Sequence, residues 1–277
     1  MPETTQADVK PQEATGGIRH LGSRLRSYFV WTPLVWLYTA ILGCVSLVVS
    51  LFDPTGERQQ NIARLWSRMI LWTVGAKVTL EGFDSIDTTK ASVYVVNHLS
   101  ALDIPVLYAC LPFHFRILAK QELFRYPFMG WHLKRSGQIP VVLEEPREAI
   151  RSLNLAVTAV KNNMPLVIFP EGGRSPDGQL QKFMGGAFYA AIKAQADVVP
   201  LVLVGTFEML RMNTYHMMPH PIRLVVADPI PTRGLTTRDT ESVSAKARAE
   251  IGQIYYANAT VPDLRDANQS PELPKEI

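Results

Sequence analysis

The chain contains little cysteine and lacks the short motifs of several common enzyme classes. Its only cysteines, Cys44 and Cys110, lie in apolar stretches far apart among 277 residues. Such usage provides no disulfide framework and fits a reducing compartment. The chain has neither the glycine-rich phosphate loop that ends in Lys-Ser/Thr nor a Gly-x-Ser-x-Gly elbow, and no internal repeat. Neither nucleotide hydrolysis nor serine hydrolase chemistry is therefore supported.

Metal and nucleic-acid binding also lack support in the sequence. His216 and His220 lie close together, but no cysteine or carboxylate stands beside them, so we expect a solvated loop and no metal. The net charge of +3 is too small to indicate nucleic acid. The charge is uneven, because residues 18–77 carry seven cationic side chains and two carboxylates, a net charge of +5. A basic segment beside apolar stretches indicates a membrane phospholipid bilayer as partner.

Residues 28–52 contain no charged side chain, and about 20 such residues can span a bilayer. Three alternatives are disfavoured. The stretch is too long and too uniformly apolar for a buried core helix, and it starts too late for a cleaved signal peptide. It also continues past Cys44, which argues against lipoprotein processing there. We expect a second, amphipathic helix over about residues 59–74, after a turn at Asp53-Pro54-Thr55-Gly56. The sequence predicts a membrane helical hairpin over residues 18–76, and a single true span stays open as the alternative.

The rest of the chain alternates between expected strands and helices. We expect strands at 78–80, 92–96, 115–119, 138–142, 165–169, 198–204 and 222–227, and helices at 104–111, 121–134, 145–161, 185–195 and 240–257. Such alternation predicts an α/β fold with a mixed central sheet covered by helices, in one domain over residues 77–257. Residues 1–17 and 258–277 lack an apolar pattern, and we expect a disordered N-terminus and a flexible C-terminal tail.

A polar string from Asn97 to Asp103 follows an expected strand, where α/β folds place their chemistry. His98 and Asp103 would lie about 140° apart on a continuous helix, so they meet only if the chain bends between them. Pro105 favours a helix start near Ile104, with a loop before it. Two interpretations stay open: a helix cap beside a loop histidine, or a dyad in which Asp103 orients His98 to accept a proton from a hydroxyl.

A second polar string, residues 169–175, also follows an expected strand. Paired glycines let the backbone approach a ligand closely, a guanidinium group suits phosphate, and a serine adds a hydroxyl. The alternative is a tight loop in which Glu171 and Arg174 pair with each other. The candidate ligand-binding residues of this string are Glu171, Gly172, Gly173, Arg174 and Ser175.

On these motifs the chain resembles the 1-acylglycerol-3-phosphate acyltransferase family of glycerolipid acyltransferases. Its His-x4-Asp motif is matched by His98 and Asp103, and its Phe-Pro-Glu-Gly-x-Arg-Ser motif by residues 169–175. Residues 119–141 look like the family's second block, and residues 199–201 resemble its fourth. The resemblance covers about residues 60–230, in family order.

The resemblance implies transfer of a fatty acyl group from acyl-CoA or acyl carrier protein to the free hydroxyl of lysophosphatidic acid, giving phosphatidic acid in phospholipid biosynthesis. His98 would be the base and Asp103 its orienting carboxylate, with no cofactor. Arg174, with Lys120 as a weaker candidate, would bind the acceptor phosphate. Glu171 would contact the glycerol hydroxyl or position Arg174.

The apolar stretch and the cysteine usage predict a location at the membrane, with the catalytic domain on the cytoplasmic face. The chain departs from the family where members often carry charged residues, at Val142-Leu143 and at Met184. Acylation of another lysolipid, or a catalytically silent membrane lipid-binding protein, stays open as the alternative.

Overall fold

The computed structural model describes residues 17–142 and 145–263. Most of the expected disordered N-terminus, most of the expected C-terminal tail, and Leu143 therefore lie outside the described residues. Gly17, assigned above to the N-terminal tail, begins the first helix. The first residues of the expected C-terminal tail contact the body of the domain, since Thr260 Oγ1 donates to Glu208 Oε1 at 2.6 Å.

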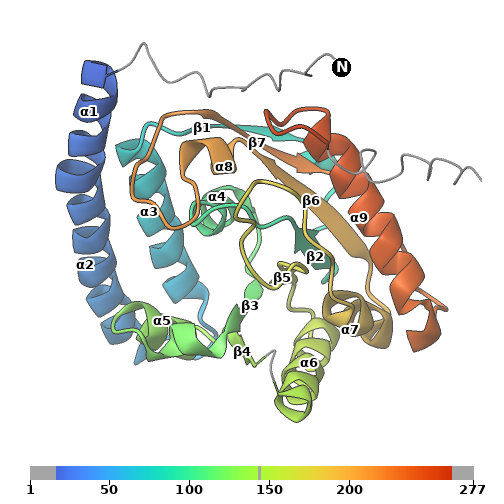
Figure 1. Ribbon diagram of the computed structural model, residues 1–277. Coiled ribbons are helices and arrows are strands. Elements are labelled where there is room, and N and C mark those ends of the chain that lie inside the picture. Colours follow the sequence, from blue (N-terminus) through green and yellow to red (C-terminus); the bar gives the residue numbers. More distant parts are fainter. Residues whose placement is uncertain (1–16, 143–144, 264–277) are drawn as a thin grey trace, which may run out of the picture.

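A seven-stranded sheet with the order β1-β7-β6-β2-β5-β3-β4 forms the centre of the domain (Figure 1). Neighbouring strands are parallel except β6 and β7, which are antiparallel, so the predicted mixed sheet is confirmed. The carboxyl ends of β2 to β6 consequently meet at one edge. The strands are β1 (Lys77–Glu81), β2 (Val93–Val96), β3 (Arg116–Lys120), β4 (Ile139–Val141), β5 (Leu166–Ile168), β6 (Val198–Val204) and β7 (Pro221–Val226).

Helices cover both faces of this sheet (Figure 1). The helices are α1 (Gly17–Arg26), α2 (Thr32–Ser50), α3 (Glu57–Thr73), α4 (Asp103–Cys110), α5 (Met129–Arg135), α6 (Pro146–Lys161), α7 (Gly186–Ala194), α8 (Thr206–Met209) and α9 (Thr240–Tyr256). One π-helical turn at Ser27–Trp31 joins α1 to α2, and 3-10 turns occur at Phe83–Ser85, Gln121–Arg125 and Thr237–Asp239.

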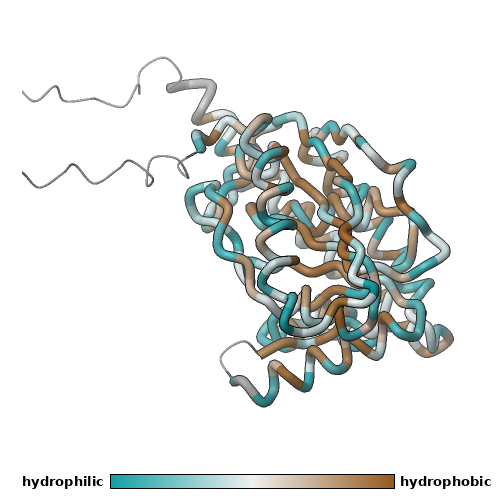
Figure 2. Tube along the Cα trace, turned by 90° about the vertical axis from the view of Figure 1, so that its right-hand side faces the viewer, coloured by the Kyte–Doolittle hydropathy of each residue, from teal (hydrophilic) through white to brown (hydrophobic). Residues whose placement is uncertain are grey.

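The core consists of two apolar layers, one on each face of the sheet. Successive residues of β2 alternate between them: Val93 and Val95 pack with α6, α7 and α9, whereas Tyr94 and Val96 pack with α3 and α4. This is the period of two that a strand imposes on its side chains. Because both layers are buried, β2 is apolar throughout. Figure 2 shows the hydrophobic segments running through the centre of the domain, with hydrophilic loops at its periphery.

The N-terminal helices form a hairpin that is fastened to the domain. The Trp66 Nε1 of α3 donates to the Thr39 hydroxyl of α2 at 2.9 Å. The Arg64 guanidinium donates to the backbone oxygens of Leu111 and Phe113 at 3.0 and 2.7 Å, just after α4 ends. The helical stretch Leu21–Ser50 is long and apolar enough to cross a membrane, and only 6% of its most apolar window is buried.

The predicted continuous helix over residues 121–134 is wrong. A 3-10 turn ends at Arg125, and α5 begins only at Met129. Pro127 interrupts the helix, because proline has no backbone N–H to donate and its ring clashes with the preceding turn. Gly130 then lets the chain pass close to Phe124, whose backbone oxygen would lie 2.5 Å from a β-carbon at position 130.

Candidate active site

A bend between β2 and α4 brings His98 and Asp103 together. The Nδ1 atom of His98 lies 2.8 Å from Oδ2 of Asp103, the first residue of α4. Asp103 is fully buried, whereas 18% of the His98 side chain is exposed. The same carboxylate oxygen accepts hydrogen bonds from the backbone N–H groups of Leu99 and Ser100, at 2.7 and 2.9 Å. The carboxylate therefore holds the intervening loop as well as the imidazole.

This arrangement assigns the protons of the His98 ring. The two backbone groups on Asp103 Oδ2 can only donate, so that oxygen is an acceptor, and His98 Nδ1 must carry the third proton. In the neutral imidazole the other ring nitrogen, Nε2, is then an acceptor. The Phe169 ring stacks on the imidazole, with centroids 3.9 Å apart and planes 24° from parallel, and holds it in place.

The loop after β5 forms hydrogen bonds with both backbone groups of His98, its N–H and its carbonyl oxygen. Glu171 Oε1 accepts from His98 N at 2.9 Å, and Ser175 N donates to the carbonyl oxygen of His98 at 2.8 Å. Burial raises the pKa of Glu171 to about 7, against the opposing effect of its two backbone hydrogen bonds. Glu171 and Arg174 form no ion pair in the described chain, so the tight-loop alternative is wrong.

Gln181 joins this loop to α9, and no motif in the sequence points to it. Its backbone N–H donates to Glu171 Oε2 at 2.9 Å, and its side-chain amide donates to Gly173 O at 3.1 Å. Arg248 of α9 in turn donates to the backbone oxygens of Gln181 and Leu180, both at 3.1 Å. These contacts with α9 join residues 67 and 68 positions apart, so no local pattern could have predicted them.

Arg174 is the cation of the loop that is available to a ligand. Its half-buried side chain makes no ion pair or hydrogen bond with any residue that the structure describes. Gly172 has a φ of +71°, which favours glycine, and a β-carbon at Gly173 would meet nothing within 4 Å. Exposed Lys120 ends β3 at the same edge of the sheet.

Ser175 and Asn97 support the loops rather than facing a ligand. The Ser175 hydroxyl is buried and donates to Asp177 Oδ1 at 3.0 Å. The Asn97 amide pairs with both backbone groups of Leu203 in β6, at 2.9 and 2.8 Å. Asn97 thereby fixes the turn that follows β2 to the neighbouring strand.

Comparisons with known proteins show which proteins this chain resembles. A family model described as Acyltransferase matches residues 77–204. The chain is 31% identical to the chloroplastic 1-acyl-sn-glycerol-3-phosphate acyltransferase LPAT1 of Arabidopsis thaliana, over 76% of this chain and 60% of that protein. It is 32% identical to a 1-acyl-sn-glycerol-3-phosphate acyltransferase of Limnanthes alba, over 87% of this chain and 85% of that protein. The matched region spans about three fifths of the length of the relatives from Arabidopsis thaliana, Cocos nucifera and Brassica napus.

The fold is also similar to the crystal structure of the 1-acyl-sn-glycerophosphate acyltransferase PlsC from Thermotoga maritima. The TM-score is 0.70 at 22% identity, over 88% of this chain and 98% of that one. This likeness confirms the predicted α/β architecture. The sequence identity to the Limnanthes alba protein, which extends over most of both chains, shows the family: the chain belongs to the 1-acyl-sn-glycerol-3-phosphate acyltransferase family.

Proposed function

We propose that the protein transfers a fatty acyl group from an acyl thioester to the free hydroxyl of 1-acylglycerol 3-phosphate and so produces phosphatidic acid. The observation that carries this proposal is the His98–Asp103 pair at the carboxyl edge of the sheet, which leaves Nε2 of His98 free to accept a proton. The names of the relatives support the same acceptor and the same type of reaction, acyl transfer.

The reaction needs one base and no covalent enzyme intermediate. His98 Nε2 takes the proton of the acceptor hydroxyl while the hydroxyl oxygen attacks the thioester carbonyl carbon. The buried Asp103 carboxylate stabilises the imidazolium that forms. When the tetrahedral intermediate collapses, the carbon–sulfur bond breaks and the thiolate leaves with the electron pair. The imidazolium then returns its proton to the thiolate, and His98 is again neutral.

Arg174 is the group that we assign to the phosphate of the acceptor. Arg174→Ala should raise KM for lysophosphatidic acid by about 10-fold to 150-fold, the factor for a lost charge-assisted hydrogen bond of about 1.5–3 kcal/mol. KM for the acyl donor should change little, because the loss falls on one substrate. Arg174→Lys should not restore recognition, since it lacks the planar fork.

The test compares lysophosphatidic acid with a lysolipid that has no terminal phosphate. Lys161→Ala is the matched control, because it also removes one cation. Lys161 ends α6 just before β5 begins, so it lies at the edge of the sheet opposite to Arg174. Equal relative use of the two acceptors by wild type and Arg174→Ala would contradict phosphate recognition by Arg174. The proposal would then reduce to acyl transfer onto an unspecified lysolipid.

We further propose that the protein acts at the membrane, with its catalytic domain on the cytoplasmic face. The support is the exposed apolar surface of the helical hairpin, where Phe29, Phe52 and Trp72 are 73%, 71% and 82% exposed. Large exposed apolar patches of this kind mark interaction surfaces. The acyl donor would then reach the site from the aqueous side as acyl-CoA or acyl carrier protein.

Extraction from membranes tests this attachment. High salt should leave the full-length protein in the membrane fraction, because burial in hydrocarbon is not screened as surface charge is. Deletion of residues 1–75 should release the protein from membranes or cause it to aggregate through the apolar surface of α4 that α3 covers. Complete release of the full-length chain by salt alone would contradict insertion.

A further inference from the structure

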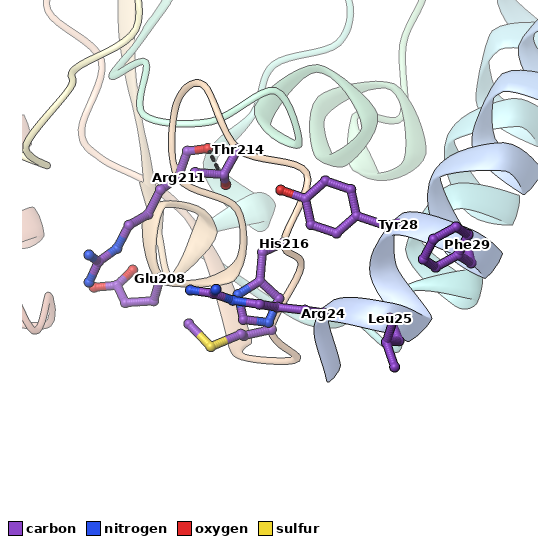
Figure 3. Close-up of a pocket in the computed structure, with 9 residues that line it drawn as sticks. Arg24, Leu25, Tyr28, Phe29, Glu208, Arg211, Thr214 and His216 are labelled. Atoms are coloured by element: carbon purple, nitrogen blue, oxygen red, sulfur yellow. Dashed lines mark hydrogen bonds between the residues drawn. The ribbon is translucent and has the colours of Figure 1, made fainter. Parts of the chain in front are cut away.

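A pocket of about 710 Å³ lies between the N-terminal helices and the chain that follows α8 (Figure 3). It contains none of the residues assigned above to acyl transfer. Its lining combines cationic, aromatic and aliphatic side chains from segments nearly 200 residues apart in the sequence. The lining residues are Arg24, Leu25, Tyr28, Phe29, Glu208, Arg211, Thr214, His216 and Met218.

The two walls of the pocket are fastened to each other. The Ser23 hydroxyl lies 2.8 Å from His216 Nε2. The buried Ser27 hydroxyl pairs with both backbone groups of Met217, at 3.2 Å to the oxygen and 3.1 Å to the nitrogen. Tyr28 and Tyr215 add an edge-to-face ring contact at 6.2 Å. The pocket is therefore formed before any ligand arrives.

The pocket carries a small positive charge. The guanidinium groups of Arg24 and Arg211 are exposed and form no ion pair with any described residue. Arg211 lies 5.4 Å from the Phe207 ring centroid, which helps to orient it. Glu208 supplies one carboxylate, and its Oε1 is occupied by Thr260. Two guanidinium groups and one carboxylate leave a net charge of +1 when His216 is neutral.

An apolar surface leads away from these cations. Leu25 and Phe29 are 49% and 73% exposed, and they continue into the exposed apolar face of α2. Both belong to the helical stretch Leu21–Ser50, which is long and apolar enough to cross a membrane. Arginine and tyrosine at the end of such a stretch lie at the level of the lipid headgroups.

We infer that this pocket binds the headgroup of a bilayer phospholipid with a single negative charge, its phosphodiester against Arg24 and Arg211 and its acyl chains along Leu25 and Phe29. A phosphodiester carries one charge and matches the net +1, whereas a phosphomonoester such as the acceptor carries about −1.5 to −2 at neutral pH. The inference rests on the membrane attachment proposed above, but not on acyl transfer.

The pocket is also joined to the catalytic loop. Leu210, directly before Arg211, accepts a hydrogen bond from the buried Ser100 hydroxyl at 2.7 Å. Ser100 lies in the loop between His98 and Asp103. A lipid bound at Arg211 would therefore fix the carboxyl edge of the sheet, where the acceptor must arrive, close to the bilayer surface.

The test measures binding of short-chain phosphatidylglycerol and phosphatidylcholine to the purified full-length protein in neutral detergent micelles. Wild type should bind phosphatidylglycerol at least about tenfold more tightly than phosphatidylcholine. Arg24→Gln and Arg211→Gln should each weaken phosphatidylglycerol binding by about tenfold or more, as expected for a lost charge-assisted contact. Inorganic phosphate at millimolar concentration should not compete, because it has no chains to place along the helix.

Arg26→Gln is the matched control, because Arg26 lies on the same helix but stacks over Trp31 at 4.1 Å, outside the pocket. It should weaken binding by no more than about fivefold, the effect of one surface cation near a membrane. Equal binding of the two lipids, or an equal loss in Arg26→Gln, would overturn the pocket assignment. Competition by inorganic phosphate would reassign the pocket to free phosphate. Failure of wild type to bind either lipid would also overturn the pocket assignment, while the membrane attachment, which salt extraction tests separately, and acyl transfer would stand.

Discussion

His98→Ala should lower the turnover number for acyl transfer by about two to four orders of magnitude, the usual contribution of a general base. Without the imidazole, no group takes the proton from the acceptor hydroxyl as its oxygen attacks the thioester. KM values for both substrates should change much less than turnover, because His98 acts in the transition state. Steady-state assays with purified protein measure the effect, and circular dichroism verifies the fold.

His220→Ala is the matched control for this variant. His220 lies in the loop before β7, and its ring pairs through Nδ1 with the backbone oxygen of Pro221 at 2.9 Å. Its replacement should leave turnover unchanged. Wild-type turnover in His98→Ala would show that the base is a different residue.

Asp103→Asn should lower turnover by a similar factor, up to about four orders of magnitude, as loss of the orienting carboxylate does in catalytic triads. An asparagine oxygen can still accept from Leu99 N and Ser100 N, so the loop keeps its shape. The negative charge that stabilises the imidazolium is lost.

The measurement separates orientation from folding. Asp103→Asn should retain most of the thermal stability and the lysophosphatidic acid affinity of wild type. Asp103→Ala should lose stability as well, because it leaves the backbone donors of Leu99 and Ser100 buried without an acceptor. Full turnover in Asp103→Asn would show that the carboxylate serves only to hold the loop.

The residues alone showed how His98 and Asp103 could meet, but left a helix cap beside a loop histidine open as the alternative; the structure shows that they do meet. Pro105 placed the start of α4 after a loop, and only a bent chain could join two residues five positions apart. The buried strands were also predictable, because a sheet covered on both faces requires continuous apolar runs. One site loop directly follows β2 and the other directly follows β5. The sequence therefore also predicted that both loops lie at the same edge of the sheet.

The contacts between the loops were not predictable in the same way. Glu171 was expected to face the substrate or Arg174, yet its carboxylate accepts from His98 N and Gln181 N. Such bonds depend on which strands are neighbours and on the position of α9, which no local pattern encodes. The failed helix over residues 121–134 is different, because Pro127 was a local signal that argued against it.

The central claim is acyl transfer to lysophosphatidic acid, and a direct assay tests it. Purified full-length protein is incubated with a panel of lysolipids and an acyl donor, either acyl-CoA or acylated acyl carrier protein, whose acyl group is radiolabelled. The lipid products are then separated. We predict labelled phosphatidic acid from at least one donor, with lysophosphatidic acid preferred over acceptors that lack a terminal phosphate. Absence of labelled phosphatidic acid with both donors would contradict the account, whether or not another lysolipid is acylated.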